Sequence, residues 1–234
     1  MRFMPPLLLF DLDNTLVDRN QAFRGWARRF LDSWALPGED LYWLSTLDCG
    51  GYFPREALMR ATAARYGLRV SLELLLRDYA DTMTELIQLP ETHREALHQA
   101  RAAGWTLGIV SNGATEQQLA KIERTGLARL VDGWVISEEA ACEKPDPRIF
   151  HLAAERCGLR PQHDDASSWT SSTWMVGDHA PADIAGAQVA GLRSVWLHHG
   201  RPWPELGYHP TLTAKGLPEA VTGVLSAPRY APAA

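Results

Sequence analysis

The feature that most constrains the fold of this chain is a set of short apolar segments that each end at a polar cluster. Leu7–Phe10 stops at Asp11, and the others lie at 105–110, 134–136, 174–176 and 194–197. Apolar side chains on both faces of so short a run are typical of strands in a parallel sheet. Helical patterns at 115–124, 147–157 and 181–190 separate them. This alternation predicts an α/β fold with right-handed crossovers, in which the polar clusters meet at the carboxyl edge of the sheet.

The region that follows the first apolar segment interrupts this alternation. Its patterns predict helices at 21–34, 39–47, 55–66 and 72–87, with a loop around 48–52. We therefore expect an inserted helical cap domain at 17–90, and an α/β core domain made of 1–16 and 91–234. A polar, serine-rich stretch at 163–172 is expected to form a flexible surface loop.

Composition narrows the class of protein. The 234 residues carry a formal net charge of −5, which argues against an extended surface for a nucleic acid polymer. No apolar run approaches the ~20 residues that span a bilayer, and the opening residues lack the apolar stretch of a signal peptide. Three cysteines without a CxxC pair favour reduced thiols. We expect a cytoplasmic protein with no membrane association, and no obligate protein partner is evident.

Two pairs of carboxylates lie at predicted strand ends. Asp11 and Asp13 follow the first strand, and Asp178 and Asp183 follow the fourth. Carboxylates this close stay ionised only beside a cation, and Mg²⁺ prefers such hard oxygen ligands. A carboxylate there could attack phosphorus, while a second one transfers protons. Asp11 and Asp13 taken alone could equally form a polar turn and helix cap, since Asp favours such positions.

Two further strand ends carry groups that suit phosphate. Ser111 and Asn112 end a strand just before a helix, whose free N–H groups can bind an anion. Lys144 precedes a Pro-Asp-Pro segment that stiffens its loop, and its ammonium could neutralise phosphate and carboxylate charge. Taken alone, each of these short motifs favours the simpler interpretation, which is a helix cap for Ser111 and Asn112 and a solvated surface lysine for Lys144.

Taken together and in this order, these motifs resemble those of the haloacid dehalogenase-like hydrolase superfamily. They are Asp11-Leu12-Asp13-Asn14-Thr15, Ser111, Lys144, and a segment that runs from Gly177-Asp178 to Asp183. The resemblance extends from about residue 7 to residue 203. It implies a Rossmann-like parallel sheet flanked by helices, and the long insertion places the chain with the helical-cap (C1-type) phosphatases. The stretches 136–150 and 177–203 are also similar to phosphatases of nucleotides and of flavin mononucleotide.

The resemblance implies a role for each motif residue. Asp11 is expected to be the nucleophile that accepts the phosphoryl group, and Asp13 the general acid and base. Mg²⁺ would be held by the Asp11 carboxylate, the Asp13 backbone carbonyl and Asp178, while Asp183 would orient Lys144 or a water on the metal. Residues expected to contact the phosphoryl group are Thr15, Ser111, Asn112 and Lys144.

Asp13 bears on the reaction, because superfamily members that dehalogenate or cleave phosphonates resemble this chain at Asp11 but lack a carboxyl two residues later. We therefore expect a Mg²⁺-dependent phosphatase that acts on a small phosphorylated metabolite, such as a nucleotide, flavin mononucleotide or a sugar phosphate. A phosphomutase that uses the same phospho-aspartate is the alternative. A phospho-acceptor switch is disfavoured, because receiver domains are about half this length and lack a cap. In the cap, Tyr52 and Arg55 are candidate contacts to the leaving group.

Overall fold

The computed structural model describes residues 5–159 and 169–228. Its contacts divide the chain into two units, Val17–Gln88 and a core that combines Met1–Leu16 with Leu89–Ala234. None of the helices among the described residues is long and apolar enough to cross a membrane.

The core is built on one parallel sheet, which confirms the predicted α/β class. Its strand order is β3-β2-β1-β4-β5-β6, and every neighbouring pair is parallel. The sixth strand was not expected from the sequence, because its three residues form no apolar run. The strands are β1 (Leu7–Phe10), β2 (Thr106–Ser111), β3 (Gly133–Ile136), β4 (Thr173–Gly177), β5 (Arg193–Leu197) and β6 (Leu212–Ala214).

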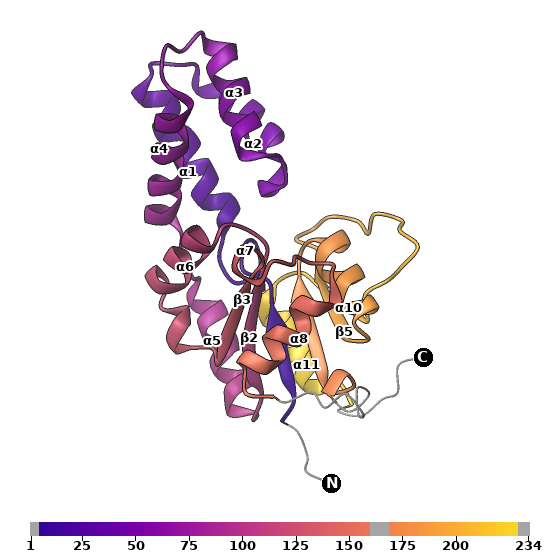
Figure 1. Ribbon diagram of the computed structural model, residues 1–234. Helices are drawn as coiled ribbons and strands as arrows, with labels where there is room; N and C mark the ends of the chain where they lie inside the picture. The colour runs from indigo at the N-terminus through magenta and orange to yellow at the C-terminus, as the bar shows by residue number, and fades with distance from the viewer. Residues whose placement is uncertain (1–4, 160–168, 229–234) are drawn as a thin grey trace. The chain divides into compact units, whose positions relative to one another are not determined.

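Helices cover both faces of this sheet (Figure 1). Alternate residues of β1 point to opposite faces of the sheet, and both faces are buried. Leu7 and Leu9 pack in one cluster with Ile149 and Phe150, and Leu8 and Phe10 are fully buried as well. The core helices are α5 (Glu91–Ala102), α6 (Thr115–Arg124), η3 (Leu127–Arg129), α7 (Ser137–Ala140), α8 (Pro147–Arg156), η4 (Ala180–Ile184), α10 (Ala185–Val189) and α11 (Leu217–Ser226). Asp146 caps the N-terminus of α8, since its side chain accepts a hydrogen bond of 2.9 Å from the Arg148 amide and Pro147 follows it.

The inserted unit is entirely helical. Its core is aromatic: Phe23 and Trp26 of α1 pack against Tyr79 of α4, and the Trp26 and Tyr79 rings lie 5.0 Å apart. Ser71 begins α4 by accepting a hydrogen bond from the Leu74 amide. The elements are α1 (Arg19–Ser33), η1 (Gly38–Asp40), α2 (Leu41–Asp48), η2 (Cys49–Gly51), α3 (Arg55–Tyr66) and α4 (Leu72–Leu86).

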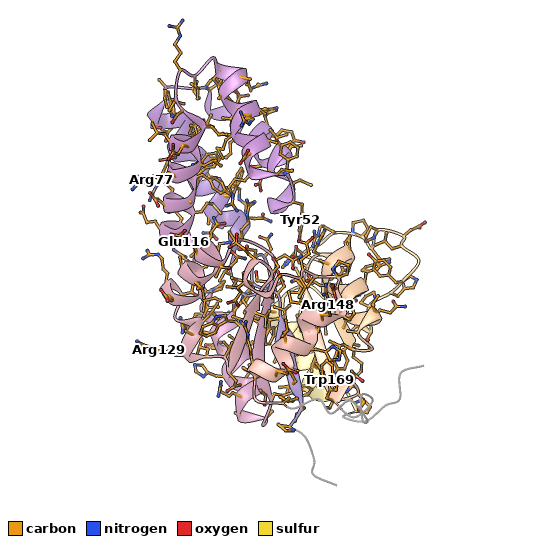
Figure 2. All side chains as sticks on the ribbon, in the orientation of Figure 1. Tyr52, Arg77, Glu116, Arg129, Arg148 and Trp169 are labelled. Atoms are coloured by element: carbon orange, nitrogen blue, oxygen red, sulfur yellow. The ribbon has the colours of Figure 1, made fainter. Side chains whose placement is uncertain are left out.

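The serine-rich stretch needs a correction. Its residues 163–168 lie outside the described part of the chain, but its end does not form a surface loop. Trp169 is fully buried and Ser172 is 4% exposed. The Trp169 ring, labelled in Figure 2, lies 4.8 Å from the ring of His151 on α8. At 169–172 the polar composition therefore concealed a buried tryptophan.

Candidate active site

The first and the last of the four motifs come together because β1 and β4 are neighbours. Phe10 pairs with Val176, so that Asp11 and Asp178 both follow the carboxyl ends of adjacent strands. The Asp11 amide donates to the Val176 carbonyl at 2.9 Å and fixes the start of the loop. The chain order reverses at this point, because β2 and β3 lie on one side of β1 and β4 to β6 on the other. Such a switch point is where open α/β sheets bind their ligands.

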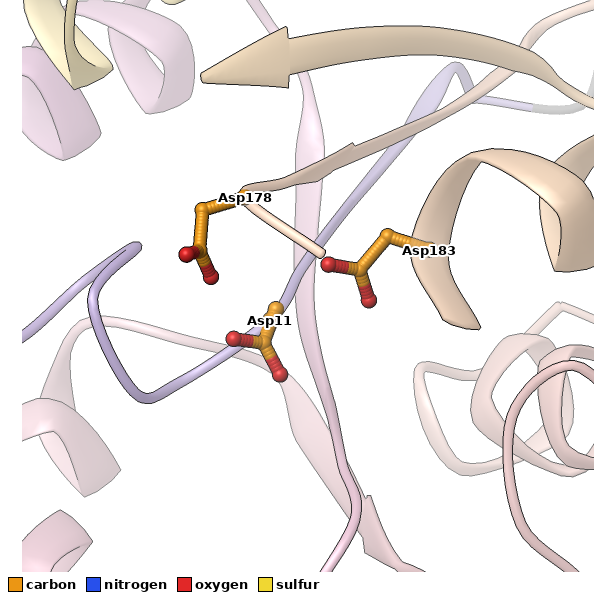
Figure 3. Close-up of side chains that lie close together, drawn as sticks. All are labelled: Asp11, Asp178 and Asp183. Carbon is orange, nitrogen blue, oxygen red and sulfur yellow. The ribbon is translucent and has the colours of Figure 1, made fainter. Parts of the chain in front are cut away.

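Three buried carboxylates gather at this edge. Carboxylate oxygens of Asp11, Asp178 and Asp183 lie within 4.8 Å of one another (Figure 3). Asp183 accepts a hydrogen bond of 2.9 Å from the His179 amide, which holds it over the end of β4. A methyl group at Gly177 would overlap the Asp183 carboxyl, so only glycine permits this approach. The spacing of the last motif is thereby explained by packing.

Lys144 binds two of these carboxylates. Its Nζ lies 2.6 Å from Asp11 and 2.7 Å from Asp183, and it also donates to the Val110 carbonyl at 2.7 Å. The side chain of Asn112 holds the backbone of Lys144 through two hydrogen bonds of 2.9 Å. The structure therefore places Asn112 as a support of Lys144, and contact between Asn112 and a phosphoryl group stays a prediction.

The charges in this cluster shift one another's proton affinity. Burial raises the pKa of Asp11 to about 8; Lys144 opposes this shift, whereas Asp183 and Asp178 add to it. Burial by itself would lower the pKa of Lys144, but the Asp11 and Asp183 carboxylates raise it above its ordinary value. Lys144 is thus a permanent cation, and one ammonium does not suffice to keep the nucleophile candidate ionised.

These residues fit a divalent cation. Three buried carboxylates offer hard oxygen donors to a common point, and their mutual repulsion disfavours the ionised state in the absence of added positive charge. The Asp13 carboxylate does not belong to the three-carboxylate cluster. It pairs instead with Lys121, whose Nζ lies 2.7 Å and 2.6 Å from its two oxygens. The part of Asp13 that remains a candidate ligand is its backbone carbonyl, and that role stays a prediction.

The raised pKa of Asp11 predicts a pH-dependent stability. The folded chain holds the Asp11 proton more tightly than an unfolded chain, whose carboxyl has the ordinary value of 3.8. The stability that this tightly held proton contributes is therefore complete below pH 3.8, and it is lost as the pH rises from there through about 8. We expect the free energy of unfolding in EDTA to fall between pH 5 and pH 8, and added Mg²⁺ to restore more of it at pH 8. Urea titrations at both pH values measure this.

Asp11→Asn serves as the control for other titrating groups. It removes this carboxyl, so the variant is expected to lose less stability over the same pH range than the natural chain. Equal pH slopes in the two proteins, or an equal gain from Mg²⁺ at both pH values, would contradict the assignment.

Ser111 and Asp13 share a partner that the motif pattern did not indicate. The Nε2 of Gln118 on α6 donates to the Ser111 hydroxyl at 2.6 Å and to Asp13 at 3.1 Å. The motif pattern does not include Gln118 or Lys121, because the pattern at 115–124 indicates only a helix. What marks the two residues is their nearly complete burial, which the structure shows.

Thr15 and Asp178 are two further residues of the predicted motifs whose surroundings the structure shows. Thr15 is fully buried, and its hydroxyl has no hydrogen-bond partner among the described residues. Asp178 is held by two residues that the motif pattern missed: the Trp196 indole donates to its carbonyl at 3.0 Å, and Arg201 contacts its carboxylate at 3.3 Å.

Tyr52 and Arg55 lie in the helical unit, where both line a cavity of about 160 Å³. Arg19 and Tyr79 form part of its wall, and the Arg19 guanidinium binds Asp48 and donates to the Tyr79 hydroxyl at 2.6 Å. Tyr52, labelled in Figure 2, is 44% exposed, and the Arg55 guanidinium lies 5.2 Å from the centre of the Tyr79 ring. The cavity thus combines cationic and aromatic groups.

Comparison with known proteins decides the family. Residues 5–191 match the family described as haloacid dehalogenase-like hydrolase. The chain belongs to this family. It is 32% identical to pyrimidine 5'-nucleotidase YjjG of Escherichia coli (strain K12), over 91% of this chain and 94% of that protein. It is also 36% identical to phosphoserine phosphatase of Thermus thermophilus, over 44% of this chain and 38% of that protein.

Solved structures have the same fold as this haloacid dehalogenase-like hydrolase. A HAD-hydrolase, YfnB of Bacillus subtilis, bound to magnesium, matches with a TM-score of 0.78 at 24% identity, covering 95% of this chain and 99% of that one. This likeness concerns the fold. The predicted family is confirmed by the sequence match, and the chain is a hydrolase.

Proposed function

We propose that this hydrolase is a Mg²⁺-dependent phosphatase that cleaves a small phosphomonoester through an aspartyl-phosphate on Asp11. The observation that carries the proposal is the separation of two carboxylates at the end of β1. Asp11 lies with Lys144 and two further aspartates, whereas Asp13 lies with Lys121. This separation supports a division of roles in which Asp11 bonds to phosphorus and Asp13 exchanges protons.

The residues divide the chemistry between them. In the first step an Asp11 oxygen bonds to phosphorus, the ester bond breaks, and the Asp13 carboxyl gives its proton to the leaving oxygen. In the second step water attacks phosphorus, the bond to Asp11 breaks, and Asp13 takes the proton of the water. The Ser111 hydroxyl and the Lys144 ammonium offer donors to the phosphoryl oxygens, whose negative charge grows in the transition state. Bound at Asp11, Asp178, Asp183 and the Asp13 carbonyl, Mg²⁺ would supply charge neutralisation.

The relatives support the proposed class of substrate. The Escherichia coli relative, which matches over nearly its whole length, is named for pyrimidine nucleotides, and other relatives are phosphatases of small metabolites. We place pyrimidine nucleoside monophosphates first, followed by flavin mononucleotide and sugar phosphates. The cap cavity supports a cyclic, polar leaving group, because the Arg55 guanidinium lies over the Tyr79 ring and Tyr52 lines the same cavity. The proposed compartment is the cytoplasm, in keeping with three unpaired cysteines.

The test is phosphate release from a panel of these esters, with Mg²⁺ or with EDTA. We expect release only with Mg²⁺, and the highest kcat/KM with a pyrimidine nucleotide. Arg55→Ala should lower kcat/KM for the preferred nucleotide more than for p-nitrophenyl phosphate, whereas Arg60→Ala, on the same helix, should change neither. No release from any ester would refute the phosphatase. If Asp11 then still formed a beryllofluoride adduct, a phosphomutase would become the better proposal.

A further inference from the structure

The inner face of α6 carries two buried polar side chains that the proposed steps do not use. Gln118 is 2% exposed and Lys121 is 3% exposed. Positions three apart lie on the same face of a helix, so both side chains point toward the same part of the core. Burial of a lysine is costly unless its charge is compensated, and few lysines in proteins are this buried. A position on α6 that packing alone would fill with an apolar residue therefore carries a charge.

Lysine is rare in this chain, which makes a buried lysine at position 121 more significant. Of its 23 basic residues, 20 are arginine and three are lysine. Lys215 is exposed, while the other two are buried and each binds a carboxylate of the loop after β1. Lys144 binds Asp11 and Lys121 binds Asp13. Each of the two carboxylates with a proposed chemical role thus has its own ammonium, on a different element of the core.

Gln118 connects this pair to the phosphate-binding group. Its Nε2 lies 3.1 Å from an Asp13 oxygen and 2.6 Å from the Ser111 hydroxyl. The Asp13 side chain itself is 28% exposed, so it keeps access to solvent on one side while Lys121 and Gln118 hold it on the other. Asp13, Gln118 and Ser111 are therefore joined through a single amide, and the distance between the proton-transfer group and the phosphoryl site is set by α6.

We infer that Lys121, with Gln118, is a positioning residue that holds the Asp13 carboxylate at a fixed place relative to Ser111. The inference rests on the proposed function, in which Asp13 must reach first the leaving oxygen and then the attacking water. Both transfers require an Asp13 oxygen within hydrogen-bond distance, first of the leaving oxygen and then of the attacking water. Lys121 touches neither; it acts through Asp13. Displacement of a reacting group by about 1 Å can cost about 100-fold in rate, which sets the scale of the expected effect.

A double-mutant cycle with p-nitrophenyl phosphate and Mg²⁺ tests the inference. Its leaving group needs little protonation, so Asp13→Ala should retain measurable turnover. We expect Lys121→Met to lower kcat about 10- to 100-fold at a nearly unchanged KM, and Lys121→Arg to restore part of the loss. In the Asp13→Ala background, Lys121→Met should lower kcat no further, because the group on which it acts is gone. Glu123→Gln, an exposed position on the same helix, is the matched control.

Two results would overturn the inference. One is a kcat for Lys121→Met equal to that of the natural chain. The other is an equal loss of kcat when Lys121→Met is made in the natural chain and in Asp13→Ala, which would mean that Lys121 acts independently of Asp13. Circular dichroism checks the fold, and Lys121→Gln replaces Lys121→Met in the cycle if the methionine variant does not fold. Failure of the proposed function itself would look different, since the natural chain would then release no p-nitrophenol.

Discussion

Asp11→Asn is expected to lower turnover of the preferred phosphomonoester by at least about 10⁴-fold, the scale on which removal of a nucleophile acts in other hydrolases. An amide cannot form the bond to phosphorus that the Asp11 carboxylate forms. The loss should fall on kcat rather than on KM, because the other phosphate-binding groups remain. Steady-state kinetics measure it, and acid quenching of the natural enzyme with labelled substrate should trap a phosphoryl group that the variant lacks.

Stability separates this loss from a loss of structure. The carboxyl of Asp11 is buried and its pKa is raised, so the folded chain gains nothing from its charge in the absence of metal. We therefore expect Asp11→Asn to unfold in EDTA at the same urea concentration as the natural chain or at a higher one. Glu155→Gln removes an exposed carboxylate on α8 of the same unit, and it is the control for the loss of one negative charge. Turnover at the natural rate in Asp11→Asn would refute the covalent mechanism.

Lys144→Met is expected to impair both turnover and stability. It removes the ammonium that binds Asp11 and Asp183 and leaves the buried Asp183 carboxylate without its counter-charge. Breaking a buried ion pair in this way costs about 3–5 kcal/mol. In addition, the phosphoryl oxygens lose a cation near the position where their negative charge grows in the transition state. Urea titrations in EDTA measure the first effect and kcat measures the second.

Magnesium makes the stability result specific. If the same carboxylates hold the ion, excess Mg²⁺ should recover part of the stability lost in Lys144→Met, because its charge replaces that of the ammonium. Lys215→Met removes an exposed lysine and should change neither stability nor kcat. Natural stability of Lys144→Met in EDTA would show that the ion pair contributes nothing, and would contradict the electrostatic account of this site.

Comparison of the two variants also separates the role of Asp11 as the reacting group from the role of Lys144 as its counter-charge. Asp11→Asn removes the reacting group and leaves a neutral partner for Lys144, whereas Lys144→Met leaves the reacting group and removes its counter-charge. Turnover should be lost in both, but stability in EDTA should fall only in the second. A similar fall in stability in both variants would mean that the ionised Asp11–Lys144 pair stabilises the fold. That result would contradict the raised pKa of Asp11, which favours its neutral form.

Much of the fold was predictable because strands buried on both faces leave a strong local signal. Leu7–Phe10 reads as a central strand, and its observed bounds are the same. Weak local signals account for what was missed. β6 has only three residues, and two of them are not fully buried. Trp169 was hidden in a polar stretch, since one buried side chain scarcely alters the local composition.

The sequence by itself determined which residues stand at the strand ends, because in a parallel sheet all carboxyl ends share one edge. Asp11, Ser111 and Asp178 were therefore expected to meet without knowledge of any contact. The pairing of each carboxylate with its lysine could be seen only in the folded chain. Lys121 is more than 100 positions from Asp13 in the chain, and no local pattern marks a helix residue as the partner of a distant loop. Such pairs arise when the sheet brings separate strand ends together, and the desolvation of a lysine on α6 becomes tolerable only there.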